Sequence, residues 1–244
     1  MHQLMFDHVT LSIRGRGRRE NEDFFIADDE NHLYILCDGI GGFIHGAHCS
    51  QLASCLLREC LENLPCRRVF SSEFETNLFF IKKSLEEINE RIYSPYLLRG
   101  TTLTFIHILP PVVFFGSIGD SRIYQWDPEF LSLKQMTRDD ITVTEGCLNE
   151  IPQIKKMLTR AVGPYPTLSF EVDFCFLKAP CSYLLCSDGF TRDFSDCEIK
   201  SFFTQYNTPS EFVEMIRRKS QEKDRKDDTT IILLQVTNME KWRN

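Results

Sequence analysis

The chain has 244 residues, of which 42% are hydrophobic and 12% aromatic, so a packed core is available and a disordered protein is excluded. The net charge of -7 disfavours nucleic acid and anionic membranes as partners. No apolar run approaches the roughly 18 residues of a membrane-spanning helix, and no linker or repeat divides the chain. We therefore expect one domain over residues 1–244, in a monomer that binds neither nucleic acid nor membrane.

The ten cysteines are scattered along the chain and form no Cys-x-x-Cys pair. Most of them stand beside apolar residues, as Cys37 does after Leu36 and Cys186 does after Leu185. Buried, reduced thiols are therefore favoured over disulfides or zinc ligands. Because no signal-peptide pattern opens the chain, we expect a cytoplasmic protein.

The first third of the chain predicts strands followed by a helix. Residues 8–13 alternate polar and apolar side chains, and residues 24–27 and 33–37 are short apolar runs separated by an acidic turn. A glycine-rich turn then leads into a helix over residues 46–64. The expected core face of this helix carries an apolar residue at every fourth position, namely Leu52, Leu56, Cys60 and Leu64.

A second helix is predicted over residues 72–93. Its apolar residues follow a 4-3-4-3-4 spacing, which suits a coiled-coil seam or, more often beside strands, a helix packed on its own domain. Strands are expected again over residues 102–109, 112–118 and 122–126. Asp120 is expected in a tight hairpin turn before the last of these strands.

The last third mixes strands and helices. Strands in bulk and helices in pairs, without strict alternation, indicate an α+β fold and not a doubly wound sheet. The expected elements are a mixed region over residues 137–158, strands near 168–177 and 183–186, helices near 196–206 and 210–220, and a closing strand over 229–236.

Acidic residues stand at the ends of several predicted apolar strands and in the expected hairpin turn. Each has a plain alternative meaning when taken alone, because an Asp-Gly pair is usually just a turn and a charged run is usually a solvated loop. Their shared placement is what makes them candidates for one site. These residues are Glu22, Asp23, Asp38, Asp120, Asp188, Asp227 and Asp228.

Carboxylates beside buried strand ends are costly to desolvate, and if they converge they raise one another's pKa. A divalent cation removes this penalty. An oxygen-only set of ligands, without His or Cys, favours magnesium, manganese or calcium over zinc. The glycines after Asp38 and Asp188 permit tight turns and let a backbone carbonyl approach a cation.

Taken in chain order, these segments resemble the motifs of the type 2C, metal-dependent protein serine/threonine phosphatase family in its compact bacterial form. The resemblance covers nearly the whole chain. It implies a four-layer α/β/β/α sandwich, in which a central antiparallel β-sandwich is flanked by pairs of helices. The matching segments are residues 18–23, 38–42, 100–102, 117–124, 158–163, 187–189 and 227–230.

The resemblance also implies two core metal ions, Mn²⁺ or Mg²⁺. Asp38 would bridge them, with the Gly39 carbonyl as a further ligand. Asp188 and Asp227 would hold one of the two ions. Asp38 would thereby be a catalytic residue as well as a metal ligand.

The other implied roles concern the second ion, a third ion and the substrate. Glu22 and Asp23 would serve the second core ion, partly through bound water, and Asp120 would help to bind a third, weaker ion. Arg18 would be catalytic because it binds the substrate phosphate. Its planar guanidinium group suits a phosphate better than the ammonium group of a lysine would.

The implied reaction is hydrolysis of phosphoserine and phosphothreonine in proteins by metal-activated water, without a phospho-enzyme. The implied partners are phosphorylated proteins, among them a cognate serine/threonine kinase or its substrates. The enzyme would oppose that kinase.

Some positions depart from the family pattern. Ile40 stands where some eukaryotic relatives carry a histidine proposed as general acid, and Ala47 stands where a glutamate is usual. Asp228 replaces an asparagine, and an Arg-Lys pair at residues 225–226 replaces a glycine. The flap, at about 137–157, is shorter than in most bacterial members, and in this family the flap shapes substrate access.

Three other interpretations fit parts of the sequence. A pseudophosphatase would keep the fold without catalysis, although Asp38, Asp188 and Asp227 are all present. A regulatory phosphatase would use the same chemistry on one small antagonist protein. A generic α/β hydrolase is disfavoured because no Gly-x-Ser-x-Gly elbow occurs. In a phosphatase without the family's histidine, His45 and His48 are the nearby candidates for a general acid.

Overall fold

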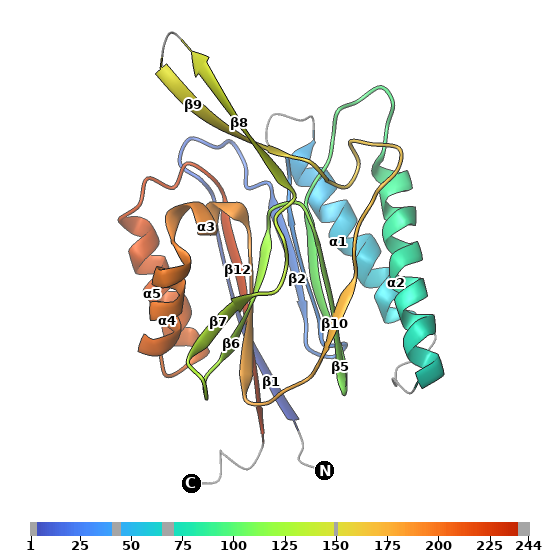
Figure 1. Ribbon diagram of the computed structural model, residues 1–244, viewed down its shortest axis with the longest axis vertical. Coiled ribbons are helices and arrows are strands. Elements are labelled where there is room, and N and C mark those ends of the chain that lie inside the picture. The colour runs from blue at the N-terminus through green and yellow to red at the C-terminus, as the bar shows by residue number, and fades with distance from the viewer. Residues whose placement is uncertain (1–3, 41–44, 65–70, 149–150, 239–244) are drawn as a thin grey trace.

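Two antiparallel five-stranded sheets lie face to face in the computed structural model (Figure 1), which describes residues 4–40, 45–64, 71–148 and 151–238. In order across the sheet, the first sheet consists of β1 (Leu4–Ile13), β12 (Thr229–Asn238), β11 (Cys181–Cys186), β6 (Arg122–Asp127) and β7 (Ser132–Gln135). The second sheet consists of β10 (Asp173–Phe176), β5 (Val112–Ile118), β4 (Leu103–Leu109), β3 (Leu33–Asp38) and β2 (Asp23–Asp28).

Helices cover the outer face of each sheet (Figure 1). The predicted α+β class and the four-layer α/β/β/α sandwich are therefore confirmed. None of the described helices is long and apolar enough to cross a bilayer. The helices over the second sheet are α1 (Gly46–Glu62) and α2 (Ser71–Ile92), and those over the first are α3 (Asp188–Asp193), α4 (Asp196–Gln205) and α5 (Pro209–Gln221).

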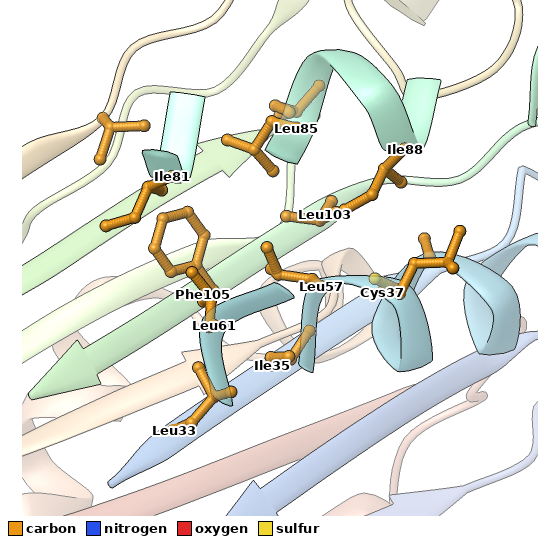
Figure 2. Close-up of a cluster of buried hydrophobic side chains, with 14 of the residues drawn as sticks. Leu33, Ile35, Cys37, Leu57, Leu61, Ile81, Leu85, Ile88, Leu103 and Phe105 are labelled. Carbon is orange, nitrogen blue, oxygen red and sulfur yellow. The ribbon is translucent and has the colours of Figure 1, made fainter. Parts of the chain in front are cut away.

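Strand β3 shows why the central strands read as unbroken apolar runs. Leu33 and Ile35 point toward α1 and α2 (Figure 2), whereas Tyr34 and Leu36 belong to the core between the two sheets. Successive side chains of a strand face opposite sides, so a strand covered on both faces must be apolar at every position. Strand β12 repeats this pattern in the first sheet.

The buried face of α1 is rotated from the predicted one. Cys49, Ala53 and Leu57 are almost completely buried, whereas Leu52 and Cys60 of the predicted stripe are only partly covered. A spacing of four drifts around a helix of 3.6 residues per turn, so such a stripe does not keep to a single buried face. The predicted face of α2 is confirmed, since this helix packs its apolar residues into the core of its own fold (Figure 2).

Several local predictions are wrong. Asp120 does not lie in a hairpin turn, because β5 and β6 belong to different sheets and the turn between them carries the chain from one sheet to the other. β5 is almost wholly apolar and β6 mixes polar and apolar residues, so neither sequence pattern reveals which sheet the strand joins. The strand expected over residues 168–177 is confined to β10, and α3 and β7 were too short for a periodicity to predict them.

The mixed region predicted over residues 137–158 contains a β-hairpin, formed by β8 (Ile141–Leu148) and β9 (Ile151–Leu158). This hairpin projects beyond the sandwich at the end where α3 begins, as Figure 1 shows. Its strands pair with each other and with neither main sheet. The hairpin therefore forms a wall at that end of the molecule.

Candidate active site

Four of the predicted aspartates line one cavity of about 770 Å³. Asp38 is the last residue of β3, and Asp188 is the first residue of α3. Asp120 lies in the turn between β5 and β6, and Asp227 lies just before β12. The ends of these elements meet at the end of the sandwich that carries the β8–β9 hairpin (Figure 1), so residues far apart in sequence face one cavity.

Asp23 supports this arrangement from the neighbouring strand. It pairs with Asp38 in the register of β2 and β3. Its Oδ2 accepts a hydrogen bond of 2.8 Å from Ser187 Oγ, and that hydroxyl accepts one of 2.9 Å from the backbone of Thr230. The starts of β2, α3 and β12 are thereby tied together. Asp23 and Glu22 do not themselves line the cavity.

Four carboxyl groups in or beside the cavity are protonated more readily than ordinary aspartates. Burial raises the pKa of Asp23 and the pKa of Asp188 to about 7. Burial also raises the pKa of Asp38 well above its ordinary value, and the charges of Asp23 and Asp188 raise it further. Burial raises the pKa of Asp120, although Arg192 opposes this shift. At neutral pH the site therefore favours a proton or another cation among its carboxylates.

Two arginines lie among these carboxylates. Arg18 donates to Glu22 Oε2 at 2.5 Å and to Asp227 Oδ1. Arg192 donates to Asp227 Oδ2 and to Asp188 Oδ2. Asp227 therefore has one guanidinium group on each of its oxygens. Both arginines also line the cavity, where they present cationic groups beside acidic ones.

The donor set fits a hard divalent cation, because it is composed of oxygen atoms. Asp23 Oδ1 is buried and has no hydrogen-bond partner among the described residues. In the part of the chain that the structure describes, no three acidic side chains already form a metal cage. The guanidinium groups of Arg18 and Arg192 hold some of these carboxylates instead. Cation binding would therefore require the carboxylates to turn away from the arginines.

Two glycines let the segments of the site approach one another. A Cβ at Gly39 would lie 2.5 Å from the backbone carbon of Gly46, at the start of α1. A Cβ at Gly189 would lie 2.0 Å from the backbone oxygen of Asp228. No side chain fits either contact, so these glycines are what bring β3 against α1 and α3 against the start of β12.

Asp228 has a structural role that is separate from the cavity. It is almost fully buried, and its two oxygens accept hydrogen bonds from the backbone of Gly15 at 2.8 Å and of Glu22 at 2.9 Å. It therefore holds the loop that carries Arg18 beside the start of β12.

The opposite wall of the cavity comes from the β8–β9 hairpin and the segment after it. Lys156, Met157 and Arg160 line this wall. Asp140, which is almost fully buried, accepts hydrogen bonds from Arg160 and from the backbone of Gly119 at 3.0 Å. The base of the hairpin is thereby joined to the turn that carries Asp120.

Sequence reasoning missed Arg192 and the pair formed by Asp140 and Arg160. Arg192 lies four residues after Asp188, a spacing that places two side chains on one face of a helix. That signal could have been used only if the six-residue helix α3 had been predicted. The histidines considered as a general acid, His45 and His48, are exposed, and neither lines the cavity. Ile40 does line it.

The relatives of this chain match it along nearly its whole length. The serine/threonine phosphatase stp of Listeria innocua is 27% identical over 248 residues, which cover 95% of this chain and 96% of that protein. The protein phosphatase PhpP of Streptococcus pneumoniae is 26% identical over 238 residues, which cover 91% and 94%. No protein-family model matches the chain.

The same architecture occurs in solved structures. The catalytic domain of the serine/threonine protein phosphatase PstP, determined in complex with two manganese ions, aligns with a TM-score of 0.76 at 24% identity. The alignment covers 97% of this chain and 100% of that domain. The two proteins therefore share one fold from end to end.

Proposed function

Because this chain belongs to the bacterial type 2C family of metal-dependent protein serine/threonine phosphatases, we propose that it hydrolyses phosphoserine and phosphothreonine in phosphorylated proteins. The observation that carries the proposal is the cavity in which aspartates from four separate segments lie beside two guanidinium groups. Such a cavity offers anionic oxygen to metal ions and cationic nitrogen to a phosphate.

The acidic side of the cavity is the place for two Mn²⁺ or Mg²⁺ ions. Asp38 and the Gly39 carbonyl would help to hold them, and Asp188 and Asp227 would hold one of the two. When bound, such a pair of ions lowers the pKa of a water molecule and neutralises charge on the phosphoryl group. The raised pKa values of Asp38 and Asp188 support this assignment, since converging carboxylates need a cation to stay ionised.

The remaining acidic residues would have lesser shares in metal binding. Glu22 and Asp23 would serve the second ion through bound water, which suits their position outside the lining of the cavity. A third ion beside Asp120 would have to share Asp188 with Arg192. We therefore expect the third site to be the weakest of the three.

The phosphate of the substrate would meet the arginines of the cavity. With their carboxylate partners engaged by metal ions, Arg18 and Arg192 would be available to donate to phosphate oxygens. A guanidinium group matches two phosphate oxygens at once. The chain would thereby orient the phosphoryl group over the aspartates.

The same family suggests the domain organisation, oligomeric state and location of the enzyme. We propose one catalytic domain with a shortened flap at about 137–157, acting as a monomer in the cytoplasm and opposing a serine/threonine kinase. Eight cysteines with described side chains are free thiols, which is consistent with a reducing compartment.

Phosphate release from a phosphothreonine peptide tests the proposed activity. The purified protein should be inactive in excess chelator and regain activity with manganese. Asp38→Asn should lower kcat by at least about 100-fold, since even residues that only support a metal ligand contribute about 10–100-fold. Asp173→Asn makes the same chemical change at an exposed position outside the cavity and should leave the rate unchanged.

A folded wild-type protein without activity in manganese would favour the pseudophosphatase. Full activity in chelator would contradict metal dependence. Equal rates for Asp38→Asn and Asp173→Asn would remove Asp38 from the site. Circular dichroism on each variant separates these outcomes from misfolding.

A further inference from the structure

Two charged loops lie side by side at one edge of the cavity, the first rich in arginine and the second of mixed charge. The first comprises residues 14–19 and the second residues 222–228, and Figure 1 shows both at the end of the sandwich that carries the β8–β9 hairpin. The backbone N–H of Arg16 donates to the carbonyl of Arg225 at 2.8 Å. Gly15 is held to Asp228 in the same way, through its 2.8 Å hydrogen bond. The loops are therefore fixed against each other.

These loops gather positive charge on a protein whose net charge is -7. Arg18 lines the cavity and Lys223 pairs with Glu198. We call the other five cations of the loops the arginine rim, which comprises Arg14, Arg16, Arg19, Arg225 and Lys226. Three of them, Arg14, Arg16 and Arg19, are exposed and form no ion pair with any described carboxylate. Only Lys226 has such a partner, Asp224 at 3.4 Å.

The rim is continuous with the cavity. Arg18, which lines the cavity, lies between Arg16 and Arg19 in the first loop, and Asp227 follows Lys226 in the second. In addition, Nε of Arg225 is buried and has no hydrogen-bond partner among the described residues. Arg14 donates to the backbone carbonyl of Arg19 at 2.9 Å and Arg16 to that of Gln221 at 3.5 Å. The rim therefore holds guanidinium groups without a described carboxylate partner beside Arg18.

Unpaired surface arginines are often simply solvated, so only their arrangement can indicate that they bind a ligand. Mobile loops would let like charges separate, but here backbone hydrogen bonds keep the cations together. The repulsion between fixed like charges is relieved when anionic groups bind. A guanidinium group binds carboxylate and phosphate oxygens through paired hydrogen bonds.

Resting on the proposed phosphatase activity, we infer that the arginine rim binds anionic groups that neighbour the phosphorylated residue in the substrate. The preferred substrates are thus phosphoprotein segments with acidic flanks or with a second phosphate close by. Binding at the rim places the scissile phosphate over the cavity. It also attracts such segments from solution, which raises the association rate and makes it dependent on salt.

Reversal of charge at the rim tests this inference. The variant Arg16→Glu/Arg19→Glu is compared with the control Arg217→Glu/Arg218→Glu, which makes the same change in net charge at exposed positions of α5. The substrates are p-nitrophenyl phosphate and three phosphothreonine peptides, with neutral flanks, acidic flanks, or a second phosphate. The measured quantity is kcat/KM from roughly 50 to 300 mM salt, over which screening weakens exposed charges.

The rim variant should lose about 10-fold in kcat/KM on the acidic or the doubly phosphorylated peptide, mainly through KM. It should keep wild-type rates on the neutral peptide and on p-nitrophenyl phosphate. Its rates should also depend less on salt. The two anionic peptides show whether carboxylates or a second phosphate provide the charge, and the control should behave as wild type.

Other outcomes overturn the inference. Equal losses on all four substrates would mean that the loops only support the catalytic site. Unchanged rates, or equal losses in the control variant, would mean that the rim recognises nothing. Should the wild type hydrolyse none of the substrates, the proposed activity fails by itself. Fluorescence anisotropy of the labelled acidic peptide then decides, since absence of binding, or binding only to phosphatidylserine vesicles, would contradict the rim's role.

Discussion

At the scale of single residues, the site places several carboxylates close to two guanidinium groups. Asp227 has Arg18 on one carboxylate oxygen and Arg192 on the other, and Arg192 also reaches Asp188. Asp38, by contrast, forms no ion pair with any described cation, and burial beside other carboxylates raises its pKa well above the ordinary value. Divalent ions would satisfy Asp38 and leave the arginines available to a phosphate.

Replacement of Arg18 tests this division of roles. Arg18→Ala should raise KM for a phosphopeptide about 10-fold or more, because a charge-assisted pair to the phosphate is lost. Arg18→Lys should restore little of this, since an ammonium group cannot bind two oxygens in one plane. Steady-state kinetics at saturating manganese measures both. An unchanged KM in Arg18→Ala would place Arg18 outside phosphate binding.

Gly189 offers a second test at this scale. In Gly189→Ala the new Cβ would overlap the backbone oxygen of Asp228, at 2.0 Å. Relief of such an overlap typically costs about 1–3 kcal/mol, and here it would move α3 and thus Asp188. Urea unfolding and manganese titration should both show a loss. Wild-type stability together with wild-type manganese affinity would contradict the close approach described here.

At the scale of elements, the short helix α3 positions part of the site, and the capped helix α4 follows it. α3 carries Asp188 and Arg192 in its six residues, and α4 begins directly after it with a capping box. In that box Ser195 Oγ accepts from the backbone of Glu198, and Glu198 Oε2 accepts from the backbone of Ser195 at 2.8 Å. The cap thus fixes the start of α4, shortly after α3 ends.

Removal of this cap should have a modest and local effect. Ser195→Ala should lower the free energy of unfolding by about 1 kcal/mol, the typical contribution of such a cap. Activity should change little, because Ser195 does not line the cavity. Urea denaturation measures the first quantity and peptide turnover the second. A loss of turnover without a loss of stability would show that the cap acts on the site directly.

The elements also show what a sequence can predict. Long periodic segments such as α2 were predicted with their buried face, because 3.6-residue periodicity is strong over 22 residues. The turn at Asp120 was misassigned, since the sequence patterns of β5 and β6 do not indicate which sheet each strand joins. Arg192 was missed because its meaning depends on α3, which has too few residues to show a period.

At the scale of the whole molecule, the sandwich brings distant chain segments together at one end. Asp23, Asp38, Asp188 and Asp227 meet because β2, β3, α3 and β12 all begin or end there. Their order in the chain made the family resemblance visible, whereas their distances could come only from the fold. The stability of the sandwich and the charge of the site are therefore linked.

The free energy of unfolding should change with pH in a definite direction. The pKa of Asp23 and that of Asp188 are raised to about 7 in the fold, from ordinary values near 4. Between these values the folded protein keeps protons that the unfolded chain releases. The stabilising effect of these protons is complete below pH 4 and is lost as the pH rises through about 7. Without metal ions, stability should therefore fall from pH 5 to pH 7.5.

The free energy of unfolding in urea, measured at pH 5 and pH 7.5 with and without manganese, tests most directly whether divalent ions neutralise the buried aspartates. We predict that the metal-free protein is less stable at pH 7.5 than at pH 5. Saturating manganese should stabilise it at both values, and more at pH 7.5, where the ion competes with fewer protons. A protein that is equally stable at both values and unaffected by manganese would contradict the site.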